Sequence, residues 1–161
     1  MTGDGAGATT PALAAVAAAG VPHTVVRTRG AGSLEEAAAL RGIAIGALLK
    51  TLVVRRGDDD YVFVLVPGDR VIDWPKLRKH LGVRRLSLPD ASEAREATGY
   101  ERGTITPFGA IRPWPVIADV SLATAGAVSI GGGAAGVSIS LEAADLVTAV
   151  AATLADVTMP G

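Results

Sequence analysis

The sequence predicts a single α+β domain, and three observations carry this prediction. The length of 161 residues corresponds to about one domain of the usual size, roughly 150 residues. Two runs rich in β-branched residues enclose the turn sequence RGDDD, which predicts a β-hairpin. Strands and helices follow one another without regular alternation, which favours α+β over a doubly wound fold. We expect a mixed, curved (barrel-like) β-sheet flanked by helices over residues 10–156, with tails at 1–9 and 157–161.

The first predicted helix and strand lie near the N-terminus. Thr10 can cap a helix over residues 11–19, and Gly20 can adopt the left-handed conformation that ends it. Residues 23–28 are rich in β-branched side chains and predict a strand.

A second helix and the hairpin follow. Ser33 and Glu36 form a capping box, which predicts a helix over residues 34–41. Residues 50–55 and 61–66 are the two β-branched runs of the hairpin, the most secure element in the sequence.

Two short helices and a short strand are predicted after the hairpin. Asp73 can cap a helix over residues 74–81, and Asp90 can cap another through residue 97. Between them, residues 84–88 predict a short strand.

The C-terminal part begins with an irregular loop. Residues 99–115 contain three prolines and three glycines, so we expect an ordered loop and no helix. A closing helix over residues 142–155 would bury Leu146, Val150 and Leu154 on one face. Three strands are predicted between the loop and this helix, at residues 116–120, 127–130 and 137–141.

Composition limits the functions that are open to the chain. The net charge of −1 argues against a globally basic nucleic-acid binder, so a polyanion must meet a local patch. The absence of cysteine excludes disulfides, cysteine-ligated metals and thiolate nucleophiles. No charged leader precedes the apolar run at residues 12–21, and no apolar stretch reaches the roughly 20 residues needed to span a bilayer. We expect a soluble, cytoplasmic protein without a membrane partner.

Common catalytic centres are poorly supported. The two histidines, His23 and His80, lie far apart and show no metal-ligand spacing, so we expect no metal site. The nucleophile motif G-x-S-x-G of serine hydrolases does not occur.

Lys50 is the first candidate functional residue. It begins the apolar strand LLKTLVV, where a buried charge is costly unless the ammonium meets an anion or water. A lysine that extends to solvent from a strand end is the alternative. The surrounding sequence is not a phosphate loop, because such a lysine would directly follow a glycine and open a helix.

Two glycine-containing segments and the basic residues are further candidates. The loop at residues 98–109 could direct main-chain amides at a ligand, or could be an ordinary crossover. The glycine-rich turn at residues 131–136 allows close approach but is weak evidence alone. Basic pairs occur at residues 55–56, 78–79 and 84–85. We favour the last pair, Arg84 and Arg85, for contact with a nucleic-acid backbone, because it lies shortly before the loop.

Four motifs together resemble the YbaK/ProRS-associated domain family over residues 10–156. They are LLKTLVV, the PGD at residues 67–69, ATGYERGTITPFG, and GGG-x-x-G followed by a strand and the AADL helix start. Domains of this family are free-standing or synthetase-appended editing domains that hydrolyse the ester of a wrongly charged aminoacyl-tRNA. The resemblance implies a metal-independent deacylase without a cofactor, acting on tRNA, typically proline tRNA carrying a small amino acid such as Cys or Ala. The acceptor end of mischarged tRNA is then the expected partner, with prolyl-tRNA synthetase as a second candidate.

The resemblance also implies roles for individual residues. Lys50 and Gly103 correspond to the catalytic positions: the lysine would hold the tRNA 3′ end and the ester, and loop amides would stabilise the developing oxyanion. Water or a neighbouring substrate hydroxyl would be the nucleophile. The implied substrate-binding residues are Thr51, Thr104, Ile105, Thr106, Pro107, Phe108, Gly109, Gly131, Gly132 and Gly133.

Departures from the family pattern keep other functions open. The branch that removes cysteine commonly has a serine at Gly131, basic residues at Ala134 and Ala135, and an aspartate at Ser138, and a second glycine often stands at Thr104. A non-catalytic module that binds tRNA ends or small metabolites is therefore an alternative. A third is a structural partner that docks on a synthetase.

Overall fold

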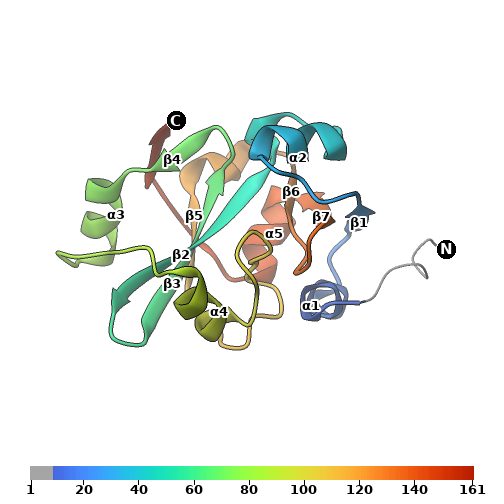
Figure 1. The fold of residues 1–161 in the computed structure, drawn as a ribbon. Helices are drawn as coiled ribbons and strands as arrows, with labels where there is room; N and C mark the ends of the chain where they lie inside the picture. Colours follow the sequence, from blue (N-terminus) through green and yellow to red (C-terminus); the bar gives the residue numbers. More distant parts are fainter. Residues whose placement is uncertain (1–8) are drawn as a thin grey trace.

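The computed structural model describes residues 9–161 and confirms the single α+β domain (Figure 1). The helices in this range are α1 (Pro11–Ala19), α2 (Leu34–Arg41), α3 (Trp74–Leu81), α4 (Ala91–Thr98) and α5 (Ala143–Ala149), with 3-10 turns η2 (Ile45–Ala47) and η3 (Val120–Thr124). The strands are β1 (Thr24–Arg27), β2 (Leu49–Gly57), β3 (Asp60–Pro67), β4 (Arg70–Ile72), β5 (Val116–Asp119), β6 (Ala127–Gly131), β7 (Val137–Glu142), β8 (Thr153–Ala155) and β9 (Thr158–Pro160). The first four helices begin at predicted capping residues, whose side chains accept from an N–H three residues on: Thr10, Ser33, Asp73 and Asp90.

The strands form three sheets in the described chain. The largest is mixed, with the order β2-β3-β5-β8, in which the β2–β3 hairpin is antiparallel and β5 is parallel to both neighbours. The second has the order β1-β7-β6, and β4 pairs with β9 in the third. In Figure 1 the β1-β7-β6 sheet and α1 lie at one end of the molecule, and α3 with β4 at the other.

One isolated bridge joins the two larger sheets. Leu48, just before β2, pairs in parallel with Ser129 of β6. The sheets do not close, so the expected barrel is an open, curved arrangement.

The four-stranded sheet separates two hydrophobic cores. On one side, Phe63 and Leu65 of β3 pack with α1 and with Ile130 and Ile139 of the smaller sheet. On the other, alternate residues of β3 pack against Leu77 of α3 and the C-terminal segment. We call these the first and second cores.

The predicted strand at residues 84–88 and the predicted closing helix differ from the structure. Residues 84–88 are not a strand; only Ser87 forms a bridge, with Arg55. The closing helix ends at Ala149, because Ala151 takes a left-handed φ of 52° and β8 follows.

The C-terminal tail is also different from the prediction. Residues 157–161 contain the fully buried Val157 and strand β9, which pairs with β4. The sequence signal for β9 is weak because this strand has only three residues. The N-terminal tail predicted at residues 1–9 lies outside the described residues, apart from residue 9.

Candidate functional site

Lys50, Gly131 and Ser138 lie on one side of the joined strands. Leu48 and Ser129 are bridged, and paired residues of neighbouring strands point to the same side. Because side chains alternate along a strand, the residues two positions further on, Lys50 and Gly131, return to that side. Ser138 is opposite Gly131 in the β6–β7 register. We call the surface formed by Leu48, Lys50, Ser129, Gly131 and Ser138 the Lys50 face.

The main chain of the 99–115 loop reaches the Lys50 face at Gly131. A Cβ atom on Gly131 would lie 3.3 Å from the carbonyl oxygen of Ile105 and 3.5 Å from that of Thr104. The missing side chain at Gly131 therefore leaves room for the loop. Lys50 and the loop, far apart in the sequence, meet the same surface.

The Lys50 ammonium is held by the turn between β3 and β4. Its Nζ donates to the carbonyl oxygen of Arg70 at 2.5 Å. Burial lowers the pKa of Lys50, and the charge of Asp69 acts in the opposite direction. Within residues 9–161 no carboxylate lies within ion-pair distance of this ammonium. The lysine is thus positioned by a neutral group, and its charge remains available to an anion.

Buried contacts fix the shape of the loop. The hydroxyl of Tyr100 donates to the carbonyl of Phe108 at 2.6 Å, and Thr106 is fully buried. Gly109 has a φ of 69°, and a Cβ there would lie 2.4 Å from the carbonyl oxygen of Pro11. Glycine is required at this position both by its conformation and by the close approach of α1.

The loop atoms nearest to a Cβ on Gly131 are the carbonyl oxygens of Ile105 and Thr104. The N–H of Gly103 donates to no acceptor in the described chain. Gly103 is exposed with a φ of 88°, so its N–H is open to a ligand and is a candidate oxyanion donor.

Three other predicted substrate-binding residues, Thr51, Gly132 and Gly133, lie away from the Lys50 face. Thr51 is opposite Leu65 in register and so faces the first core, where its Oγ1 is buried without a hydrogen-bond partner. Gly132 and Gly133 hold α1: the Gly132 carbonyl accepts from the Thr10 hydroxyl at 2.6 Å, and Gly133 lies against Tyr100.

The end of the loop lines a different part of the molecule. Pro107, Phe108 and Gly109 line a cavity of about 400 Å³ together with Phe63 and Trp114. A second cavity, of about 270 Å³, lies beside Asp69 and Arg70. The loop therefore contributes its 104–105 main chain to the Lys50 face and its later residues to the larger cavity.

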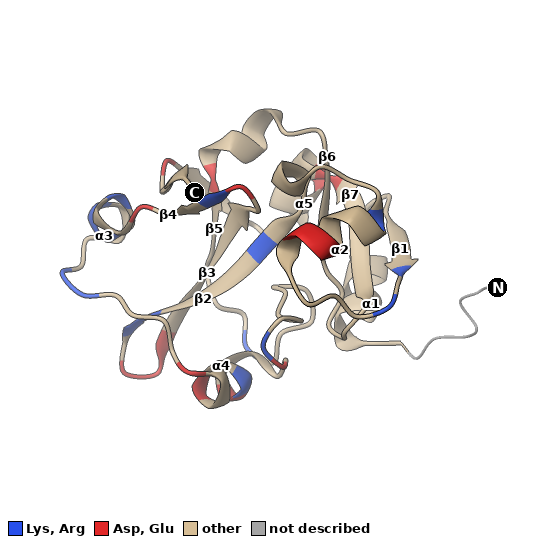
Figure 2. Cartoon of the chain, turned by 45° about the horizontal axis from the view of Figure 1, so that its top comes forward, with Lys and Arg blue, Asp and Glu red and all other residues tan. Residues whose placement is uncertain are grey.

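Arg84 and Arg85 are exposed and lie beyond the far end of β2. Ser87 exchanges two main-chain hydrogen bonds with Arg55, of 2.8 and 3.1 Å. Arg55 is five positions from Lys50, or about 17 Å along a strand. Because the segment runs antiparallel to β2 at this bridge, Arg84 and Arg85 lie further still from Lys50. Figure 2 shows Lys and Arg on α3 and the segment after it, away from the β1-β7-β6 sheet.

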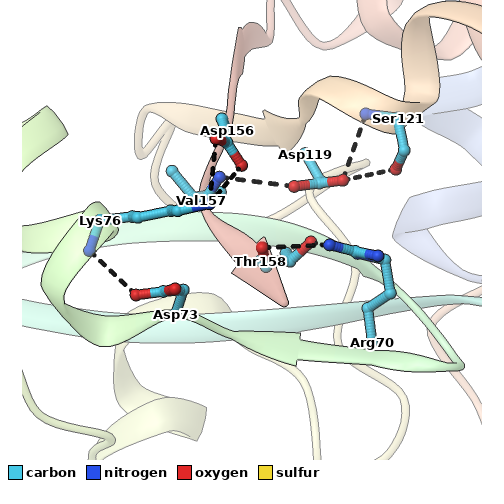
Figure 3. Close-up of polar contacts among 8 residues, drawn as sticks. All are labelled: Arg70, Asp73, Lys76, Asp119, Ser121, Asp156, Val157 and Thr158. Carbon is cyan, nitrogen blue, oxygen red and sulfur yellow. Dashed lines mark hydrogen bonds and ion pairs between the residues drawn. The ribbon is translucent and has the colours of Figure 1, made fainter. Parts of the chain in front are cut away.

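The structure adds residues that sequence reasoning does not single out. Arg70 supplies the carbonyl that holds Lys50, and its own side chain donates to Thr158 of β9 (Figure 3). Arg41 donates to Ser129 on the Lys50 face at 3.0 Å. The sequence carries a signal for Asp69 and Arg70, because Asp69 ends the PGD motif and Arg70 follows it directly. Arg41 had none, because its partner is 88 residues away.

Two structural findings bear on ligands and location. The described residues contain no group of three or more His, Cys, Asp or Glu side chains that could hold a metal ion. Among the described helices, none is both long and apolar enough to cross a membrane.

The fold is one that editing proteins share. A solved structure described as that of "a putative trans-editing enzyme for prolyl tRNA synthetase" superposes with a TM-score of 0.85 at 26% identity, covering 95% of this chain and 99% of that chain. Another, of the hypothetical protein APE2540, gives a TM-score of 0.86 at 26% identity and covers 93% and 100% of the two chains. The fold thus places the chain among α+β proteins that include this putative trans-editing enzyme. Residues 28–149 match the model of the aminoacyl-tRNA editing domain, so the chain belongs to that family.

Curated relatives agree with this assignment. The "Proline--tRNA ligase" of Xanthomonas axonopodis is 32% identical over 133 residues, which is 83% of this chain and 23% of that protein. The "Putative Cys-tRNA(Pro)/Cys-tRNA(Cys) deacylase EbsC" of Enterococcus faecalis is 28% identical over 68% of this chain and 66% of its own length. The chain spans only 15% of the ligase of Thermosipho africanus.

Proposed function

We propose that this protein is a trans-acting aminoacyl-tRNA deacylase. Its substrate is mischarged tRNA, with proline tRNA carrying a small amino acid such as Cys or Ala as the specific form, and the reaction needs no metal ion. The placement of Lys50 and Gly131 on one side of the bridged strands, with the 104–105 main chain beside Gly131, is the observation that carries the proposal. Membership of the editing family supports it. Prolyl-tRNA synthetase is the proposed protein partner.

The groups on the Lys50 face suit an aminoacyl ester. A nucleophile adds to the carbonyl carbon of the ester, and the carbonyl oxygen becomes an oxyanion. The bond between the carbonyl carbon and the ribose oxygen then breaks. Lys50 and the N–H of Gly103 are the donors for the negative charge that develops. The carbonyl oxygens of Thr104 and Ile105 can accept from the α-ammonium of the amino acid. The products are the free amino acid and the tRNA hydroxyl.

Catalysis then depends mainly on positioning. Water is the nucleophile that releases the amino acid, either by direct attack on the ester or after the neighbouring ribose hydroxyl has taken up the acyl group by transesterification, so no protein nucleophile is required. Rigid placement of the ester can supply several orders of magnitude in rate. A terminal adenosine that lacks the neighbouring hydroxyl distinguishes the two: unchanged hydrolysis means that water acts alone.

The test compares hydrolysis of proline tRNA charged with Cys, Ala or Pro by the wild type and by Lys50→Ala. We expect the wild type to remove a small non-cognate amino acid without added zinc, using metal-stripped protein and RNA folded with magnesium. Lys50→Ala should lose at least about a hundredfold in kcat/KM, as expected when a group that stabilises developing charge is removed. Lys76→Ala, an exposed lysine paired with Asp156, is the matched control.

Each alternative result has a defined meaning. Tight binding of tRNA 3′ ends without turnover would replace the proposal with a binding module. Binding to prolyl-tRNA synthetase with neither RNA binding nor hydrolysis would indicate a structural partner. Activity that requires zinc would contradict the metal-independent mechanism.

A further inference from the structure

Arg41 lies at the C-terminal end of α2, beside the Lys50 face. The Nη1 atom of Arg41 donates to Oγ of Ser129 at 3.0 Å. Ser129 is only 1% exposed, so this contact places the guanidinium directly on the strand that also carries Gly131.

The positive charge of Arg41 has no carboxylate partner within residues 9–161. By comparison, Arg29, Arg55, Arg56, Arg95 and Arg112 all form ion pairs. Burial lowers the pKa of Arg41. A half-buried cation with one neutral partner retains N–H donors for an anion, and a guanidinium fork matches the oxygens of a phosphate.

The register places Arg41 close to the proposed reaction centre. Leu48 and Ser129 are bridged, and Lys50 and Gly131 each follow two residues later on the same side. Two residues of a strand span about 7 Å. Ser129, which holds the guanidinium, therefore lies about 7 Å along the strand from Gly131, and this main-chain spacing is comparable to the length of one ribose.

We propose that Arg41 binds the 5′-phosphate of the 3′-terminal nucleotide of the tRNA. This proposal rests on the proposed function, because it takes the ester to lie between Lys50 and Gly131. The amino acid offers no alternative anion at its backbone, since its carboxyl group is esterified and its amino group is positive. The phosphate is separated from the ester by its own ribose, which agrees with the spacing of the two sites.

The first experiment measures binding without turnover. Adenosine, AMP and inorganic phosphate are titrated into the wild type, Arg41→Met, Arg41→Lys and Arg56→Met, and NMR shifts are followed. The wild type should bind AMP more tightly than adenosine by about tenfold or more, as expected for a charge-assisted hydrogen bond. Arg41→Met should abolish this preference, Arg41→Lys should keep part of it, and Arg56→Met should be unchanged. Phosphate alone should bind weakly and compete with AMP.

The second experiment measures hydrolysis of 3′-alanyl-adenosine with and without a 5′-phosphate. Arg41→Met should lower kcat/KM for the phosphorylated ester to that for the unphosphorylated ester, and should leave the latter unchanged. Thermal melting shows whether each variant folds. If Arg41→Met does not fold, the charge-conserving Arg41→Lys takes its place.

The outcomes separate this inference from the proposed function. If the wild type hydrolyses neither ester but prefers AMP through Arg41, the phosphate site stands and the deacylase proposal fails. If hydrolysis occurs and Arg41→Met affects both esters equally, the deacylase stands and the phosphate site is wrong. A wild type without any preference for AMP over adenosine also overturns the phosphate site.

Discussion

At the scale of single residues, Lys50 and Thr51 show how strand alternation assigns neighbouring side chains to different environments. Lys50 is opposite Val66 in register and turns to the Lys50 face, where a carbonyl holds its ammonium. Thr51 is opposite Leu65 and turns into the first core, where its hydroxyl has no partner. The two residues therefore need different tests, although they are adjacent in the segment LLKTLVV.

Deacylation should depend on the protonation of Lys50. Burial lowers the pKa of Lys50 from its ordinary value of 10.5, and Asp69 partly restores it. Since the ammonium must be charged to act, hydrolysis after correction for spontaneous loss should decrease with rising pH, starting below 10.5. Asp69→Asn removes the opposing charge and should move this decrease to lower pH. In Lys50→Arg the group stays charged, so any remaining activity should lack the part of the decrease that Asp69→Asn shifts.

Thr51→Val should stabilise the fold. The buried hydroxyl without a partner costs free energy that an isosteric methyl group does not, so we expect about 1 kcal/mol in the free energy of unfolding. Urea denaturation of both proteins measures this difference. A lower kcat/KM with unchanged stability would instead assign Thr51 to substrate binding.

At the scale of elements, the 99–115 loop has neither helix nor strand and is held by side-chain contacts to main-chain groups. Tyr100 binds the Phe108 carbonyl, and the indole of Trp114 donates to the carbonyl of Ala97 at 2.7 Å. These hydrogen bonds fix the loop from the core side, while residues 104–105 meet Gly131. Removing one of them should therefore change catalysis through the position of the loop.

Tyr100→Phe tests this anchoring. Burial raises the pKa of Tyr100 to about 12, so its hydroxyl remains a donor throughout the neutral range. The variant leaves the Phe108 carbonyl unpaired, and we expect stability to fall by about 1–3 kcal/mol, with a lower kcat and little change in KM. Steady-state kinetics below the melting temperature provide the measurement. A change in stability alone would show that the loop does not need this anchor for catalysis.

The segment after α3 is the element proposed to meet the tRNA backbone. It lies more than about 17 Å from Lys50, and one strand of a nucleic-acid helix advances about 3.4 Å per nucleotide. Arg84 and Arg85 should thus contact phosphates of the acceptor stem, beyond the terminal nucleotides. The Arg84→Gln/Arg85→Gln double variant should weaken tRNA binding and reduce the salt dependence of log K by about 0.7–0.9 for each phosphate that is no longer neutralised.

The control for this prediction is a minimal ester. Hydrolysis of 3′-alanyl-adenosine should be the same in the double variant and the wild type, because this substrate does not reach the segment. An unchanged salt slope for tRNA would leave Arg84 and Arg85 as solvated surface residues.

At the scale of the whole molecule, the C-terminal segment is linked to Lys50 on the side of the sheet that holds the second core. Asp119 of β5 is 2% exposed and accepts from Ser121 and from the N–H of Val157 (Figure 3). Thr158 accepts from Arg70 at 2.6 Å, and the Arg70 carbonyl in turn holds Lys50. The last strand is thus linked to the candidate catalytic lysine through β4.

This network predicts sensitivity to acid. Burial alone would raise the pKa of Asp119, but hydrogen bonds from Ser121, Thr158 and Val157 outweigh burial and lower it. A lowered pKa in the folded state contributes stability above the unfolded value, near 3.8, and this stability is lost as the pH falls through the folded value. Asp119→Asn should lower the melting temperature at neutral pH and reduce its decrease in acid. An equally steep decrease would assign the acid sensitivity to other groups.

The sequence predicted the elements with local signals and missed those that depend on distant partners. Capping residues and glycines marked the first four helices, and β-branched runs marked the β2–β3 hairpin. β4, β8 and β9 have three residues each and no periodicity to detect. The serine that holds Arg41 comes from a residue 88 positions away, so no local pattern could reveal it. The carbonyl that holds Lys50 comes from a residue 20 positions away, and the PGD motif marked only its neighbourhood.

The single bridge between Leu48 and Ser129 has a consequence for motion. Lys50 and Gly131 belong to different sheets, and in the described chain this bridge is the one pairing between them. Small movements at this joint would change the separation of the two groups, and the first core, which contains residues of both sheets, keeps these movements small. An empty protein can then sample a narrow range of widths there. A substrate that contacts both strands selects one width and acts as a second fastening between the sheets, and slower exchange of the amide protons at this joint would accompany binding.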